Sequence, residues 1–284
     1  MNEARPSMTA QRVAMRRAAH QILDKPVVFE DPLAIRMLGP EGARRLEAAP
    51  RAHEAHPVSK PLRAFLAARG RVAEERMSAA MAEGVRQCVI LGAGLDTFAY
   101  RHGDRAPGVR FFEVDHPATQ AWKRARLAAA GIAAPASLAF VPVDFERDAL
   151  SDALAAAGFD LAAPAAFSWL GVSMYLGPDD VRATLRFVGA RSKGSSIVFD
   201  YAIDTKLLNW FERWAYRRIA ARVARAGEPW KSGFAPEALI AEMRAIGFTR
   251  TDDLDSKTIN ARWFKGRRDG LRVRRLAHVM DAGV

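Results

Sequence analysis

The sequence predicts an α/β fold with a central parallel sheet, and two observations lead to that class. Five apolar segments of strand length alternate with helical segments, and a glycine turn, ILGAGLDT at 90–97, ends the first strand. Strands that alternate with helices pair in parallel through right-handed crossovers. The predicted strands cover 87–94, 109–115, 138–144, 165–172 and 195–201.

Helical segments with proline near the start and glycine at the end are predicted between and around these strands. Residues 1–84 show helical periodicity broken by prolines and finish with a long helix over 61–84. After the last core strand, a helical insertion at 202–230 carries four aromatic residues, which could cover a site, form a buried stripe or contact a second copy: Trp210, Phe211, Trp214 and Tyr216. A helix over 236–247 precedes two strands, 248–254 and 270–280, which are expected to form a hairpin at the sheet edge with no helix between them.

These segments suggest one domain of 284 residues: a helical N-terminal cap (1–84), a cofactor-binding core (85–201), a helical insertion or lid (202–235) and a C-terminal helix with a strand hairpin (236–284). Half of the residues are hydrophobic, which allows a large core. No apolar run reaches the ~20 residues that a membrane helix needs. Cys88 is the only cysteine, and the N-terminus lacks the apolar run of a secretory signal, so we expect a soluble cytoplasmic protein without a membrane partner.

The net charge of +11 leaves a nucleic-acid-binding or nucleic-acid-modifying protein as an alternative. The basic residues are densest at 15–17, 217–225 and 266–275, but they are interleaved with acids along the chain. They do not alternate with aromatic residues in the manner of nucleic-acid-binding surfaces. A nucleic-acid partner is therefore ranked below a small-molecule substrate, and the oligomeric state is left open.

Three neighbouring strands are predicted to bring cofactor-binding groups to one edge of the sheet. Gly92 and Gly94 would let a ligand approach the backbone closely. Asp115 ends the second strand 21 residues after Gly94, near the spacing of an acid that binds ribose, and Asp144 ends the third strand. A nicotinamide site would need a third glycine where Thr97 stands, and the charge of Asp96 would repel a pyrophosphate. A phosphate-free nucleoside, S-adenosylmethionine, fits this pattern better than a dinucleotide does.

Five blocks of the sequence resemble the leucine carboxyl methyltransferase-like family of class I S-adenosylmethionine-dependent methyltransferases: ILGAGLDTFAYR, FFEVDHPATQAWKRARL, FVPVDFERDAL, FSWLGVSMYL and SSIVFDY. The N-terminal block RAAHQILDKPVVFEDPLA is also similar to the family, and the match runs from about residue 12 onwards. The resemblance implies a Rossmann-like sheet of seven strands with the last one antiparallel. It also implies methyl transfer to a carboxylate or hydroxyl oxygen of a small molecule, and for the bacterial branch of the family it suggests a secondary metabolite.

The same resemblance assigns the cofactor-binding residues. Gly92, Ala93 and Gly94 would face the methionine part, Asp115 with His116 the ribose side, and Asp144 with Phe145 the adenine. An arginine in the preceding helix would hold the cofactor carboxylate, with Arg71 slightly preferred over Arg69. The sequence departs from the family at Leu170, where many members have a glutamate, so that contact is not transferred.

The methyl acceptor could need a general base if it is an alcohol or phenol, whereas a carboxylate needs none. The candidates are His116, Tyr175 and His20, with Tyr201 as a further one. Each has a structural alternative: His116 as a helix start, His20 on a polar helix face, and Tyr175 in core packing. No HExxH motif or cluster of cysteines and histidines indicates a metal site.

Overall fold

The structure is a computed structural model that describes residues 8–54, 58–225, 227 and 229–284. Its sheet has seven strands in the order β3-β2-β1-β4-β5-β7-β6. The strands are β1 (Gln87–Leu91), β2 (Arg110–Asp115), β3 (Leu138–Pro142), β4 (Ala166–Trp169), β5 (Ser196–Ala202), β6 (Arg250–Leu254) and β7 (Ala277–Gly283). The first five are parallel, as predicted, and β7 is antiparallel to both neighbours.

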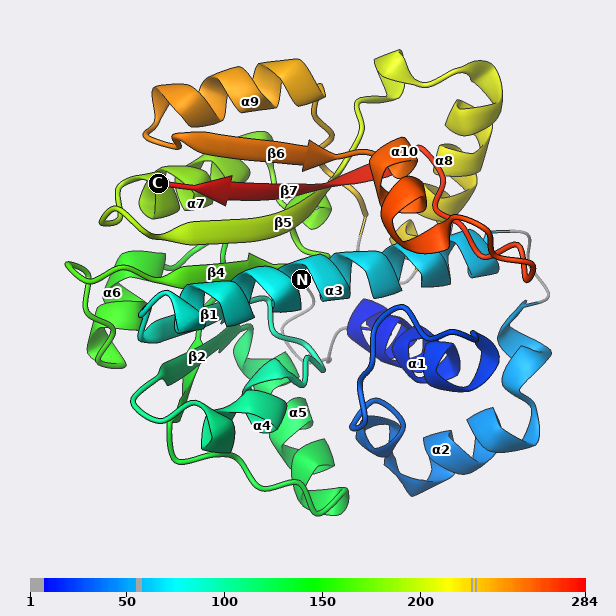
Figure 1. The fold of residues 1–284 in the computed structure, drawn as a ribbon, viewed down its shortest axis with the longest axis horizontal. Helices are drawn as coiled ribbons and strands as arrows, with labels where there is room; N and C mark the ends of the chain where they lie inside the picture. The colour runs from blue at the N-terminus through cyan, green and yellow to red at the C-terminus, as the bar shows by residue number, and fades with distance from the viewer. Residues whose placement is uncertain (1–7, 55–57, 226, 228) are drawn as a thin grey trace.

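Helices cover both faces of this sheet (Figure 1). They are α1 (Met8–Leu23), α2 (Gly39–Ala48), α3 (Ser59–Ala82), α4 (Phe98–His102), α5 (Pro117–Ala129), α6 (Leu150–Ala156), α7 (Pro178–Gly189), α8 (Trp210–Ala224), α9 (Pro236–Ala245) and α10 (Ser256–Ile259). Short helical turns lie at η1 (Arg36–Leu38), η2 (Pro50–Glu54), η3 (Gly103–Arg105), η4 (Ser173–Tyr175), η5 (Thr205–Leu207) and η6 (Asn260–Phe264), the last being π-helical.

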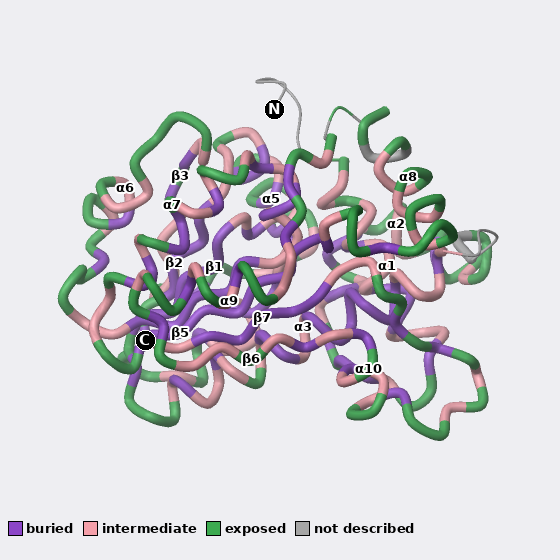
Figure 2. Tube along the Cα trace, turned by 90° about the horizontal axis from the view of Figure 1, so that it is seen from above, coloured by how far each residue is buried: buried purple, intermediate pink, exposed green. Residues whose placement is uncertain are grey.

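The pleat of β1 shows how the core is divided between the two faces. Val89 and Leu91 pack with α6, α7 and α9 on one side, whereas Cys88 and Ile90 pack with α3 and α4 on the other. All five residues of β1 are buried, as expected for a central strand covered on both faces. Figure 2 shows this buried layer running through the middle of the molecule. Among the described residues, no helix is both long and apolar enough to cross a bilayer.

The two terminal strands pair antiparallel at one edge of the sheet, as predicted, with β6 outermost and β7 between β5 and β6. The expectation that no helix separates them is wrong, because α10 and η6 lie between β6 and β7, and β7 begins at Ala277, well after the predicted 270. The burial pattern explains this order, because β7 is buried almost throughout. In contrast, β6 carries charged, partly exposed side chains that suit an edge strand.

Candidate active site

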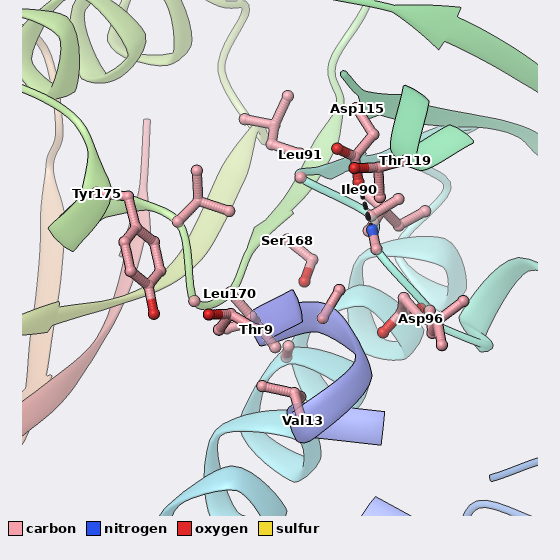
Figure 3. Close-up of a pocket in the computed structure, with 18 of the residues that line it drawn as sticks. Thr9, Val13, Ile90, Leu91, Asp96, Asp115, Thr119, Ser168, Leu170 and Tyr175 are labelled. Atoms are coloured by element: carbon pink, nitrogen blue, oxygen red, sulfur yellow. Dashed lines mark hydrogen bonds between the residues drawn. The ribbon is translucent and has the colours of Figure 1, made fainter. Parts of the chain in front are cut away.

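A cavity of about 220 Å³ lies at the carboxyl ends of β1, β2, β3 and β4, where parallel sheets bind ligands. The turns after these strands form one wall, and the stripe of α3 that includes Arg69, Ala73 and Met77 forms another. The N-terminal half of α1 closes a third side through Thr9, Val13 and neighbouring residues (Figure 3). Residues Gly227, Pro229 and Lys231, which follow α8, complete the lining.

The turn after β1 needs both of its glycines. Gly92 has φ +64° and Gly94 has φ +47°, in the left-handed region that L side chains rarely adopt. A Cβ on Gly92 would stand 2.2 Å from Cγ2 of Val172, which follows β4. The turn therefore carries bare backbone against the cavity, as the sequence pattern predicted.

The Asp115 carboxylate fixes this turn to the end of β2. Its Oδ2 accepts from the Gly94 N–H at 2.5 Å (Figure 3), and its Oδ1 accepts from the His116 N–H at 2.7 Å. Burial raises the pKa of Asp115, and the two N–H groups partly offset that effect. Each oxygen keeps a lone pair for a further donor, because a carboxylate offers about four acceptor positions.

The adjoining part of the cavity has the groups that a nucleoside needs. Asp144 and Phe145 line it from the segment after β3, and the Val143 N–H donates to the Asp115 carbonyl at 2.9 Å, which ties the two strand ends together. Thr119 of α5 lines the cavity beside Asp115 (Figure 3). Its Oγ1 is buried and has no hydrogen-bond partner among the described residues. A buried hydroxyl without a partner is costly, so a ligand that bonds to it would be favoured.

A charged network borders the other end of the cavity, next to the glycine turn. Arg17 of α1 donates to Asp31 at 2.5 Å and to the Thr97 hydroxyl at 3.1 Å, and it lies 3.6 Å from Asp96. Its Nε is buried and lacks a hydrogen-bond partner within the described part of the chain. Arg17 thus keeps one donor for a ligand.

Arg101 and Glu74 form a second pair in this network. Two guanidinium nitrogens of Arg101 donate to the two oxygens of Glu74 at 2.6 and 2.5 Å, and His102 lies 3.1 Å from the same carboxylate. Burial alone would raise the pKa of Glu74, but hydrogen bonds from His102 and Arg101 outweigh it and lower the pKa to about 2. Glu74 is therefore ionised at neutral pH.

Of the two arginines considered for the cofactor carboxylate, Arg69 lines the cavity and Arg71 does not. The preference for Arg71 is therefore corrected: it points to the far side of α3, where it pairs with Glu75 and stacks near Trp263. Arg69 is buried and donates to Asp200 of β5 at 2.6 Å, and the other Asp200 oxygen accepts from the Gly171 N–H at 2.6 Å. Side chains two residues apart on a helix point about 200° away from each other. The sequence did not show which of Arg69 and Arg71 faces the cavity.

The three candidate bases lie in different surroundings. His116 lines the cavity, but its Nδ1 accepts from the Ala118 N–H at 3.2 Å and caps α5. A neutral His116 then carries its proton on Nε2, so this nitrogen is a hydrogen-bond donor and not a base. Tyr175 lines the cavity from η4 (Figure 3), and Leu170 does so from the segment after β4.

His20 is not at the cavity, and its proposed substrate contact is corrected. The side chain is buried, with Nδ1 2.7 Å from Asp24 and Nε2 accepting from the N–H groups of Val28 and Phe29. Because Nε2 accepts, Nδ1 carries the proton and donates to Asp24. His20 therefore shapes the segment that leads to Phe29. Tyr201 is also fully buried, and its hydroxyl donates to Asp253.

The charged residues of the cavity that were missed as site residues include Arg17, Glu74 and Arg101, and also Glu146 and Lys231. For Glu74 a signal was present, because residues 66, 69, 70, 73, 74 and 77 recur at helical spacing and all line the cavity. Arg17 and Arg101 are brought to the site by long-range contacts, for which the local sequence has no signal. Among the described residues, no group of three His, Cys, Asp or Glu side chains could hold a metal ion.

The sheet order and the cavity at the carboxyl ends of the parallel strands define the class of protein, a methyltransferase fold of the Rossmann-like kind. Solved structures agree: one from Thermobifida fusca YX, described as a methyltransferase, superposes with a TM-score of 0.60 at 19% identity and covers 99% of this chain and 96% of its own. A DUF574 family protein from Streptomyces avermitilis has a TM-score of 0.55 at 17% identity, with 96% of both chains covered.

The sequence comparisons identify the family. The leucine carboxyl methyltransferase family model matches residues 10–189, and the chain belongs to this family. The Bacillus subtilis (strain 168) protein YktD, named as an S-adenosyl-L-methionine-dependent methyltransferase, is 31% identical over 99% of each chain. A Mycolicibacterium smegmatis protein with the same designation is 32% identical over 87% of this chain and 77% of its own. The protein is thus an enzyme that uses S-adenosylmethionine, which confirms the cofactor predicted from the glycine turn.

Proposed function

We propose that this enzyme methylates an oxygen atom of a small molecule whose body is largely apolar. The observation that carries the proposal is the mixed lining of the cavity, which combines charged side chains with the apolar side chains of Val13, Leu66 and Leu170. When bound, S-adenosylmethionine supplies an electrophilic methyl group on a sulfonium sulfur. The chain's own residues would hold the two reactants in line and exclude water from the cavity.

The charged and polar groups of the lining suit both ends of the cofactor. We assign Asp115 and Thr119 to the ribose hydroxyls and Asp144 with Phe145 to the adenine. The free Nε donor of Arg17 would bind the methionine carboxylate, and the ionised Glu74 together with Asp96 would attract the ammonium group. These roles follow from the buried hydroxyl of Thr119, the buried Nε of Arg17 and the low pKa of Glu74.

The charges around the cavity favour a hydroxyl acceptor over a free carboxylate. Each lysine or arginine that lines the cavity within the described residues already has an acidic partner: Arg17 with Asp31, Arg69 with Asp200, Arg101 with Glu74, and Lys231 with Glu146. A second anion would have to compete for these cations. Tyr175 lines the cavity from η4, and we propose that its hydroxyl orients the oxygen atom that accepts the methyl group.

The cofactor assignment is tested by isothermal titration calorimetry with S-adenosylmethionine and S-adenosylhomocysteine. Asp115→Ala should weaken both by about 10- to 100-fold, because hydrogen bonds to a charged group contribute roughly 1.5–3 kcal/mol. Asp152→Ala is the matched control, because Asp152 is exposed on α6 and does not line the cavity. Equal affinity in the two variants would rule out the assignment of Asp115.

The acceptor class is tested with isotope-labelled cofactor and a panel of matched alcohols, phenols, carboxylic acids, amines and thiols. Labelled methyl ethers should form from the alcohols or phenols. Exclusive formation of methyl esters would overturn the preference for a hydroxyl while leaving oxygen methylation in place. Transfer only to nitrogen or sulfur analogues would overturn oxygen methylation itself.

A further inference from the structure

An exposed aromatic cluster on η5 and α8 has no role in the cavity. The side chains of Leu207, Trp210, Phe211 and Trp214 are 49, 76, 55 and 50% exposed, and none of them lines the cavity. Of the three roles considered from the sequence, a buried stripe is therefore wrong for Trp210, Phe211 and Trp214. Tyr216 differs from them: it is half-buried and packs edge-on against Trp230. Contiguous exposed apolar side chains of this size indicate an interaction surface.

The surroundings of the aromatic cluster are strongly basic. Residues 205–225 contain six lysines and arginines but a single acid, Glu212. Arg213, Arg217 and Arg218 are exposed on α8 next to the aromatic cluster. Glu212 is largely covered and lies 3.8 Å from Arg275 Nη1, so the loop before β7, with Arg272 and Arg274 also exposed, joins the same end of the molecule (Figure 1). Folding thus combines two of the basic stretches noted in the sequence with aromatic residues.

The ring geometry distinguishes between two kinds of anionic partner. Phe211 and Trp214 stack on each other at 5.9 Å with an interplanar angle of 23°, and the Arg218 guanidinium lies 5.1 Å over the Trp214 ring. Nucleic acid would need free ring faces on which bases can stack. Here Phe211 packs against both Trp210 and Trp214, so the three rings form one apolar body, and such a body suits insertion between lipid headgroups.

We propose that η5, α8 and the loop before β7 form a peripheral docking surface for an anionic lipid bilayer. The aromatic cluster would lie at the headgroup level, where tryptophan is enriched in membrane proteins, and the arginines would face anionic headgroups. Peripheral binding of this kind needs no membrane-spanning helix, and none is found among the described residues. The proposal does revise the expectation that the protein has no membrane partner. Gly227, Pro229 and Lys231 follow α8 in the sequence and line the cavity, so the chain leads from the docking surface to one wall of the active site.

The test is co-sedimentation of the full chain with vesicles, either of phosphatidylcholine alone or with about a third of phosphatidylglycerol. The wild type should sediment with the mixed vesicles and much less with the neutral ones, and added salt should release it. Arg217→Gln with Arg218→Gln should weaken partitioning about thirtyfold, at about 1 kcal/mol for each charge. Trp210→Ser with Trp214→Ser should weaken it about tenfold or more.

Arg44→Gln with Arg51→Gln is the matched control, because both arginines are exposed on or next to α2, away from this surface, and the change in net charge is the same. All variants should keep the wild-type affinity for S-adenosylhomocysteine, which shows that they are folded.

Equal binding to the two kinds of vesicle, or an equal loss in the control, would overturn the proposal. So would a preference for a single-stranded oligonucleotide over vesicles, which would assign the surface to nucleic acid. A dimer in light scattering that is lost in Trp210→Ser with Trp214→Ser, without vesicle binding, would assign it to a second copy of the chain.

Discussion

Gly92→Ala should destabilise the enzyme, and Val172→Ala should restore part of the loss. A left-handed backbone costs an L residue about 1–2 kcal/mol, and Gly92 has φ +64°. The new Cβ would also stand 2.2 Å from Val172 Cγ2, and such overpacking costs about 1–3 kcal/mol. Valine is stiff about χ1, so it does not rotate away easily. The expected loss in the free energy of unfolding is therefore about 2–5 kcal/mol.

Urea unfolding of the wild type, both single variants and the double variant measures the coupling between the two positions. Val172→Ala removes both γ carbons and leaves its own Cβ 3.4 Å from the new methyl group, so the double variant should regain about 1–3 kcal/mol. Gly131→Ala is a matched control, because Gly131 has φ +61° and open space around its Cβ position. If the two single losses simply add, or if Gly92→Ala costs no more than Gly131→Ala, the steric argument is wrong.

Three further predictions concern stability, cofactor binding and reactivity. Asp24→Asn should cost about 1.5–3 kcal/mol of unfolding free energy at neutral pH, because it weakens the two charged hydrogen bonds that the buried Arg63 donates to Asp24. Burial raises the pKa of Asp24, but Arg63 and His20 lower it to about 2, so wild-type stability should fall from about pH 4 toward pH 2; an unchanged acid limb in the variant would contradict this. Arg71→Ala should leave the calorimetric affinity for S-adenosylmethionine within about twofold, since an exposed pair with Glu75 contributes little, and a tenfold loss would return Arg71 to the site. Burial raises the pKa of Cys88 to about 12, so its reaction with a thiol reagent near pH 8 should occur only at the rate of unfolding, and prompt labelling would refute its burial in β1.

The core of the fold could be predicted from the sequence because its signals are local. Apolar runs between glycines and prolines marked each of the first five strands, and all five are confirmed. Which of the two terminal strands is outermost could not be predicted, because strand order is decided by long-range packing. The sequence of residues 277–283 contains no local signal that this strand pairs with β5 as well as with β6. The basic residues at 270–275 also extended the predicted strand too far, since they belong to the preceding loop.

The site divides in the same way. Gly92, Gly94, Asp115 and Asp144 lie at strand ends, so the strand pattern alone brought them to one cavity. Arg17 reaches the same cavity from α1, some 80 residues away from Thr97, its hydrogen-bond partner. Such contacts depend on how the N-terminal helices pack on the sheet, and that packing is not encoded in any short stretch.

The insertion of β7 between β5 and β6 has a consequence for synthesis on the ribosome. The edge of β5, seven fully buried residues, stays without its partner until the chain has grown from residue 202 to beyond 277. At roughly 5–20 residues per second, this interval lasts about 4–15 s. During this interval the apolar strand β5 exposes unpaired N–H and C=O groups along one edge, and such an edge promotes aggregation of the nascent chain. Slowing translation past β5 should therefore lower the yield of active enzyme unless a chaperone shields that strand.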